Sequence, residues 1–98
     1  MSGRLAKAVE RARDVAGISL RDLAKRSGMS SGYVCRIENA QARPSDRALR
    51  KIASAVDVDV DVLFAEAGRL PEDVVKFLAR RPLLLMRVVR IVRQEMQS

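Results

Sequence analysis

The chain contains no histidine and no tryptophan, and its 98 residues include a single cysteine. Without histidine it lacks the usual general base, the commonest metal ligand and a side chain that titrates near neutral pH. The single Cys35 can form neither an intramolecular disulfide nor a cysteine-cluster zinc site. The sequence also has no glycine-rich phosphate loop and no obvious carboxylate pair. We therefore expect no catalytic residue, no metal site and no cofactor, and we set an enzymatic function aside.

Long apolar runs are missing as well. The longest, Pro82 to Met86, is much shorter than the ~20 residues that a membrane-spanning helix requires. The amino terminus is charged and helical in pattern, which is unlike a signal peptide. These features predict a cytoplasmic protein.

Positive charge exceeds negative charge, and the formal net charge is +7. Residues 1–56 hold 12 Lys/Arg against five Asp/Glu, residues 57–75 hold one against six, and residues 76–98 hold six against one. A basic body, an acidic connector and a basic tail indicate surfaces with separate roles. The net charge favours a polyanionic partner, either nucleic acid or an anionic membrane surface, over a merely basic protein.

Aromatic residues make up only 3% of the chain, whereas hydrophobic residues make up 48%. Leucine, valine, isoleucine and alanine must therefore fill the core, and they recur at helical spacing almost throughout. Residues 56–62 alternate valine with aspartate and could form a strand, but a lone strand has no partner, so we expect a turn. Caps and stops predict seven helices: up to Gly17, Leu20–Ser27 after the cap Ser19, Ser30 to about Asn39, onward from the cap Ser45, Asp59 to Gly68, onward from near Pro71, and Pro82 to about Met96.

Residues 17–45 are the most informative segment, because two short capped helices meet there at a glycine. This arrangement presents a helix to the DNA major groove. The second helix opens with Ser30, Ser31 and Gly32, which are small enough to let its backbone approach a duplex, and Arg36 follows on the same face. We expect these four residues to read bases, with Arg36 pairing with a guanine. A phosphate contact or plain solvent exposure of Arg36 is the alternative.

Two further residues of this helix have alternative roles. Tyr33 either contacts the DNA backbone or closes one edge of the core. Cys35 is expected to be a small, half-buried filler, because little in its neighbourhood would activate a thiol.

Phosphate contacts should come from helix termini and their flanking loops, because the amide groups at a helix start carry a positive partial charge. Arginine and polar side chains at these places can hold the DNA backbone. The expected phosphate-binding residues are Ser19, Arg21, Tyr33, Asn39, Gln41, Arg43 and Arg47.

These motifs resemble the Cro/C1-type, or XRE-type, helix-turn-helix repressors over about residues 4–68. The matching positions are Arg13, Gly17–Ser19, Leu23–Ala24, Gly28–Ser30, Tyr33, Arg36–Asn39, Arg43–Ser45 and Leu49–Ala53. The resemblance implies an all-α fold with a lambda-repressor-like five-helix DNA-binding domain. It also implies a partly buried ion pair between Arg13 and Glu38 that braces the motif, the alternative being ordinary surface charge. The sequence departs from the family at Leu20, usually a glutamine that contacts phosphate or base, and at Ala40, commonly a glycine.

The tail of the chain is amphipathic. From Pro82 to Ser98, Arg87, Arg90 and Arg93 form one polar stripe beside an apolar face that is broad for a helix on a small monomer. We interpret the tail as a homodimerisation element; the alternatives are packing under the five-helix core, a dock for an antirepressor or toxin protein, or a membrane surface, which we disfavour. The expected dimerisation residues are Val74, Phe77, Leu78, Leu84, Leu85, Val88, Val89, Ile91 and Val92.

Together these features predict a helix-turn-helix DNA-binding domain over residues 1–68 and a C-terminal helical extension over residues 69–98. The predicted function is sequence-specific regulation of transcription, by a dimeric repressor that reads a palindromic operator in double-stranded DNA through the helix at 31–39. The alternative is an antitoxin-like interaction module whose C-terminal helices bind a partner protein and whose DNA binding serves autoregulation.

Overall fold

The computed structural model of the chain describes residues 2–98, all of whose regular structure is helical. The elements are α1 (Ser2–Ala16), α2 (Leu20–Ser27), α3 (Ser31–Glu38), α4 (Asp46–Val56), α5 (Val60–Ala67), α6 (Glu72–Ala79) and α7 (Pro82–Met96). The predicted all-α class is thus confirmed, and the alternating segment at 56–62 forms a turn followed by α5. Pro71 precedes α6 as its N-cap, whereas Pro82 is itself the first residue of α7.

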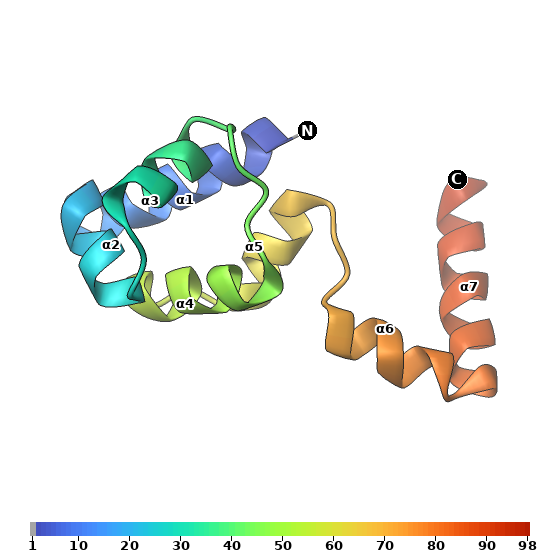
Figure 1. The fold of residues 1–98 in the computed structure, drawn as a ribbon. Helices are drawn as coiled ribbons and strands as arrows, with labels where there is room; N and C mark the ends of the chain where they lie inside the picture. Colours follow the sequence, from blue (N-terminus) through green and yellow to red (C-terminus); the bar gives the residue numbers. More distant parts are fainter. Residues whose placement is uncertain (1) are drawn as a thin grey trace.

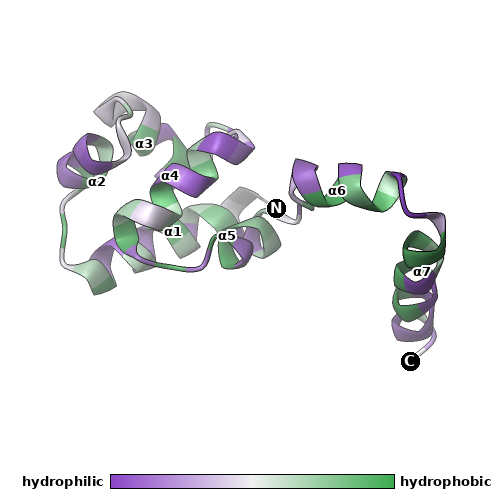
Figure 2. Cartoon of the chain, turned by 90° about the horizontal axis from the view of Figure 1, so that it is seen from below, coloured by the Kyte–Doolittle hydropathy of each residue, from purple (hydrophilic) through white to green (hydrophobic). Residues whose placement is uncertain are grey.

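Helices α1–α5 form one body around a shared apolar core (Figure 1), and in the view of Figure 2 α2 and α3 lie on one side of it and α1 and α5 on the other. Helical periodicity turns one face of each helix inward, and these faces supply the buried side chains. The core consists of Leu5, Val9, Leu23, Ala24, Val34, Ile37, Leu49, Ile52, Ala53, Val56, Leu63 and Phe64. Its aliphatic character follows from the low aromatic content.

Helices α6 and α7 lie outside this body, as Figure 1 shows at the right. The radius of gyration is 15.5 Å, compared with about 13 Å for a compact domain of about 100 residues. The long axis of 45 Å against 28 and 22 Å reflects the same projection. Packing of the tail beneath the five-helix core, one of the alternatives raised by the sequence, is not the arrangement found.

Short-range hydrogen bonds at the helix ends explain why the boundaries could be predicted. The hydroxyl oxygens of Ser19, Ser30 and Ser45 each accept a bond of 3.1 Å from the backbone N–H three residues on, the standard N-cap geometry. Gly28 ends α2 with φ of +69°, a left-handed conformation that glycine adopts without a steric penalty. The turn between α2 and α3 is therefore encoded locally.

Within residues 2–98, no helix combines the length and apolar character needed to cross a membrane.

Candidate nucleic-acid interface

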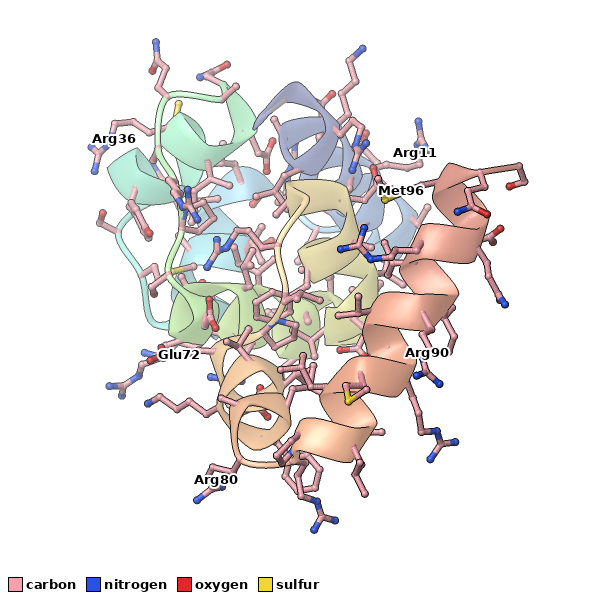
Figure 3. The ribbon with its side chains drawn as sticks, turned by 90° about the vertical axis from the view of Figure 1, so that its right-hand side faces the viewer. Arg11, Arg36, Glu72, Arg80, Arg90 and Met96 are labelled. Carbon is pink, nitrogen blue, oxygen red and sulfur yellow. The ribbon has the colours of Figure 1, made fainter. Side chains whose placement is uncertain are left out.

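Helix α3 is anchored on one side and open on the other. Val34 and Ile37 are buried and hold it against α1 and α2. The four predicted base-reading residues, Ser30, Ser31, Gly32 and Arg36, are all exposed. Figure 3 shows Arg36 projecting from the side of the molecule opposite Arg11. The first turn of α3 and the arginine one turn later are therefore accessible together.

Arg36 is supported from within its own helix. Its guanidinium lies 5.7 Å from the ring centroid of Tyr33, within the range of a cation–π contact. The ring of Tyr33 is half-buried and packs against the core, so it closes one edge of the core and also provides a surface for Arg36. A Cβ added at Gly32 would meet nothing closer than Arg36 Nη1 at 3.9 Å. The space above Gly32 is thus open to an approaching duplex.

The expectation for Cys35 is wrong. This residue is exposed, and its sulfur accepts a 3.3 Å hydrogen bond from Asn39 Nδ2. The reason is that α3 packs through Val34 and Ile37, whereas residue 35 lies on the side of the helix that faces away from them and is exposed among the described residues.

The predicted phosphate-binding residues surround α3. All except the half-buried Tyr33 are exposed, and they lie at the starts of α2 and α4 and in the loop that follows α3: Ser19, Arg21, Asn39, Gln41, Arg43 and Arg47. We call these residues the phosphate-binding rim. Within residues 2–98, its cations, Arg21, Arg43 and Arg47, form no ion pair with a carboxylate, and neither does Arg36. The rim therefore presents positive charge that is not neutralised inside the protein.

The loop after α3 takes its direction from Ala40. This residue has φ of +58°, the left-handed conformation that the glycine common in the resembled family would adopt freely. The backbone N–H of Gln41 donates to the carbonyl of Arg36 at 2.7 Å, which ends α3 and turns the chain toward Arg43. The departure from the family pattern thus leaves a positive-φ residue that carries a side chain.

Arg13 and Glu38 join the first helix to the end of α3. Arg13 donates from Nε to Glu38 Oε2 at 2.9 Å and from Nη2 to Oε1 at 3.1 Å, and a third bond of 3.1 Å runs from Nη1 to the carbonyl of Ile18. The two side chains are 17% and 7% exposed. The hydrogen bond with Glu38 raises the pKa of Arg13 above its usual value. This bidentate pair holds α3 against the body, and the donors of Arg13 are used within the fold.

Two features of this region were missed by sequence reasoning. The first is a basic hollow of about 540 Å³ between α2 and α4, where Lys25, Arg26, Arg50 and Lys51 join Arg47. Its signal was visible in the sequence, since residues 47, 50 and 51 are at helical spacing. The second is a contact between Arg69 and Asp46, two residues to which the sequence assigned no role.

The predicted dimerisation residues all lie on the two helices of the projecting tail, and Figure 2 shows the corresponding apolar stretches of α6 and α7. Leu78, Leu84 and Val88 are half-buried where the two helices meet. The remaining six are at least 39% exposed, namely Val74, Phe77, Leu85, Val89, Ile91 and Val92. An apolar hollow of about 630 Å³ between the two helices is lined mainly by Val74, Phe77, Leu78, Leu84 and Val88.

Comparison with known proteins places this architecture among DNA-binding domains. Residues 4–67 match a family model described as a helix-turn-helix domain. An uncharacterized HTH-type transcriptional regulator of Mycobacterium tuberculosis, found in two strains, is 41% identical over 58 residues, which is 59% of this chain and 41% of that protein. The chain thus spans about two fifths of the length of these curated relatives.

Solved structures agree with the family match. Two crystal structures of the clp gene regulator ClgR from Corynebacterium glutamicum are similar to this chain. One has a TM-score of 0.61 and 28% identity over 68% of this chain and 87% of its own. The other has a TM-score of 0.63 and 25% identity over 93% of this chain and 92% of its own, so the similarity extends into the tail.

Proposed function

Because this chain belongs to the helix-turn-helix domain family, we propose that it is a DNA-binding transcriptional regulator, and more finely a dimeric repressor that reads a palindromic operator through α3. The observation that carries the proposal is the open face of α3, on which Ser31, Gly32 and Arg36 lie together. Such a role would place the protein in the cytoplasm. The proposal divides the chain into a DNA-binding unit, residues 1–68, and a dimerisation unit, residues 69–98.

The proposed reading mechanism separates positioning from recognition. Arg21, Arg43 and Arg47, with the polar groups of Ser19, Asn39 and Gln41, hold the phosphates on either side of the groove and supply affinity. Ser30 and Ser31 bring the start of α3 close to the bases. Arg36 then donates two hydrogen bonds to the O6 and N7 atoms of a guanine, a pattern that other base pairs do not present in the major groove.

The proposed dimer follows from what a repressor needs and what the tail exposes. Two α3 helices must meet half-sites about 34–36 Å apart, one turn of the duplex. Apolar side chains on α6 and α7 are exposed in the single chain, including Phe77 at 46% and Ile91 at 61%. A second copy of the same tail would cover both sets at once, because a two-fold interface uses one patch twice.

The experiment is a footprint on the DNA flanking the protein's own gene, followed by binding measurements with two variants. Arg36→Ala should lose roughly 30-fold or more in affinity for the protected operator, because a dimer on a palindrome loses one bidentate contact of about 1–3 kcal/mol in each of its two subunits. Its binding to random DNA should change much less. Arg11→Ala is the matched control, because it removes the same charge from the opposite side of the molecule (Figure 3).

An equal loss on operator and random DNA would assign Arg36 to a phosphate. The absence of a protected site at low and at moderate salt would overturn the regulator proposal. The alternative, an antitoxin-like module, would be favoured by a stoichiometric complex in which residues 69–98 hold a defined second polypeptide instead of a second copy of this chain.

A further inference from the structure

One carboxylate joins the tail to the DNA-facing rim. Asp46 is the first residue of α4, and its Oδ1 accepts a hydrogen bond from Nη2 of Arg69 in the connection between α5 and α6. Its Oδ2 accepts a 2.8 Å bond from the backbone N–H of Glu72, the first residue of α6. Nη1 of Arg69 also donates to the carbonyl of Pro44, just before α4. We call these contacts the Asp46–Arg69 link.

The side chains of the Asp46–Arg69 link are largely buried, unlike those of an ordinary surface ion pair. The side chains of Arg69 and Asp46 are only 16% and 20% exposed. The Arg69 guanidinium lies 5.7 Å from the ring centroid of Phe64, a core residue. The backbone hydrogen bond from Glu72 lowers the pKa of Asp46 below its usual value, because the bond stabilises the charged carboxylate. Arginine with carboxylate and carbonyl acceptors together forms a geometrically defined contact.

Few other polar contacts hold the tail. Within residues 2–98, the hydrogen bonds and ion pairs that join residues 72–98 to α1–α5 are the Glu72–Asp46 bond and a 3.7 Å pair between Arg50 and Asp73. The side chains of that pair are 49% and 74% exposed, so it contributes little. The direction in which α6 leaves the body therefore depends mainly on the Asp46–Arg69 link.

The link also lies within the proposed DNA interface. Pro44 and Asp46 are flanked in the chain by Arg43 and Arg47, two residues of the phosphate-binding rim. The same few residues therefore define the edge that meets DNA and the start of the helix that leads to the second subunit. A rotation of the tail at this point moves the two α3 helices of a dimer relative to each other.

We propose that the Asp46–Arg69 link positions the two DNA-binding units of the dimer and thereby sets the half-site spacing that the regulator accepts. This inference rests on the proposed function. Successive base pairs are about 3.4 Å apart, so a displacement of α3 by only that amount changes the register in which the second subunit reads its half-site. A rigid link excludes neighbouring registers; a broken one admits them.

The experiment uses the full chain and its native cysteine. Cys35 is the only cysteine and is exposed on α3, so a nitroxide label on it reports the distance between the two α3 helices of a dimer by pulsed electron–electron double resonance. The label requires no substitution and no DNA. Operator duplexes with the spacer lengthened or shortened by one and two base pairs then measure spacing preference, using unlabelled protein.

Wild-type protein should give one narrow distance distribution and bind the native spacing about tenfold or more tighter than a spacing changed by one base pair, which is comparable to the effect of a mismatched base pair. Arg69→Ala and Asp46→Ala should broaden the distribution and reduce that preference to about threefold or less, while remaining dimeric. Asp46→Asn keeps one acceptor oxygen and should fall between. Lys76→Ala, the control, removes a charge from an exposed pair with Glu72 and should behave as wild type.

A distribution as narrow in Arg69→Ala and Asp46→Ala as in the wild type, with the spacing preference retained, would overturn the inference and leave the proposed function intact. A wild-type protein that gives no distance between subunits and sediments as a monomer would overturn the inference and the dimer in the proposed function, while the footprint would still test DNA binding. Thermal unfolding identifies any alanine variant that fails to fold; in that case Asp46→Asn, compared with Lys76→Ala, decides.

Discussion

Arg13 and Arg36 have the same side chain in opposite surroundings, and the difference assigns their roles. Arg13 is 17% exposed and donates to both oxygens of Glu38, so its charge is neutralised within the fold. Arg36 is exposed, lies over the ring of Tyr33 in a cation–π contact and, within residues 2–98, forms no ion pair with a carboxylate. A guanidinium whose donors are not used inside the protein can pair with a base edge or a phosphate at little desolvation cost. Unused donors make an arginine available for DNA, and the place of Arg36 on the open face of α3 makes it the base-reading candidate.

Glu38→Gln tests the structural pair. The substitution keeps the shape but removes the charge and leaves one donor of Arg13 without its acceptor, so the free energy of unfolding should fall by about 1–3 kcal/mol. Thermal unfolding is the measurement, and each kcal/mol corresponds to about 4–8 °C in Tm for a domain of this size. Glu10→Gln is a suitable control, because it removes the same charge from an exposed position of α1. An unchanged Tm would contradict a bracing role for Arg13 and Glu38.

Ala40→Gly tests the strained turn after α3. A residue with a side chain at φ of +58° is about 1–2 kcal/mol less favourable there than glycine. The extra freedom of glycine in the unfolded chain offsets about 0.4–1 kcal/mol of this gain. We expect a net stabilisation of about 0.5–1 kcal/mol by urea unfolding. Ala65→Gly, within α5, should instead destabilise by about that amount; destabilisation by both would show that the turn is not strained.

At the scale of elements, the helices divide into those that satisfy their apolar face within the chain and those that do not. Helices α1–α5 bury the residues that their periodicity points inward. Helices α6 and α7 pack on each other but bury no residue fully. Each Å² of apolar surface left in water forfeits about 25 cal/mol of favourable burial free energy. Contact with a second surface would therefore stabilise the exposed apolar faces of α6 and α7.

Removing α7 tests the proposed role of the tail. A chain that lacks residues 82–98 should sediment as a monomer at concentrations where the full chain is a dimer. The point variant Val89→Asp should weaken the dimer by roughly ten- to a hundredfold, since each of the two subunits loses a valine that is 40% exposed in the single chain and whose full burial is worth about 1.5–3 kcal/mol. Gln94→Asp adds the same charge at an exposed polar position of α7 and should have a smaller effect. An unchanged sedimentation coefficient after truncation would remove the dimerisation claim.

At the scale of the whole molecule, charged residues are distributed unevenly along the chain. The formal net charge is +7, but residues 57–75 hold six acidic side chains and one basic one. This acidic connector includes Glu72 and Asp73 at the start of α6, and it separates the cationic body from the cationic tail. The positive charge therefore lies in the body and in the tail, on either side of the connector.

The salt dependence of DNA binding measures this distribution. Arg21, Arg43 and Arg47 of each subunit would give a dimer about six phosphate contacts, so log K should fall against log[salt] with a slope near −5. Arg43→Ala should reduce the slope by about 2 for the dimer, and to the same extent on operator and random DNA. Arg93→Ala in α7 is the control. A steeper wild-type slope would mean more phosphate contacts than these six, and the basic hollow around Lys25 and Lys51 would be their expected source.

Helix ends and helix faces could be predicted from the sequence, because they depend on residues that are near neighbours in the chain. Helix ends follow from bonds over three or four residues, such as the Ser30 cap, and helix faces follow from periodicity. The Arg13–Glu38 pair, 25 residues apart, was implied only through resemblance to a family.

Tertiary structure alone decided the rest. Asp46 and Arg69 are 23 residues apart, and nothing in their local sequence distinguishes them from surface charges. The projection of the tail depended on how α6 leaves the body. Contacts between distant segments arise only once the helices are packed, because their geometry is set by the arrangement of the helices and not by the residues beside them.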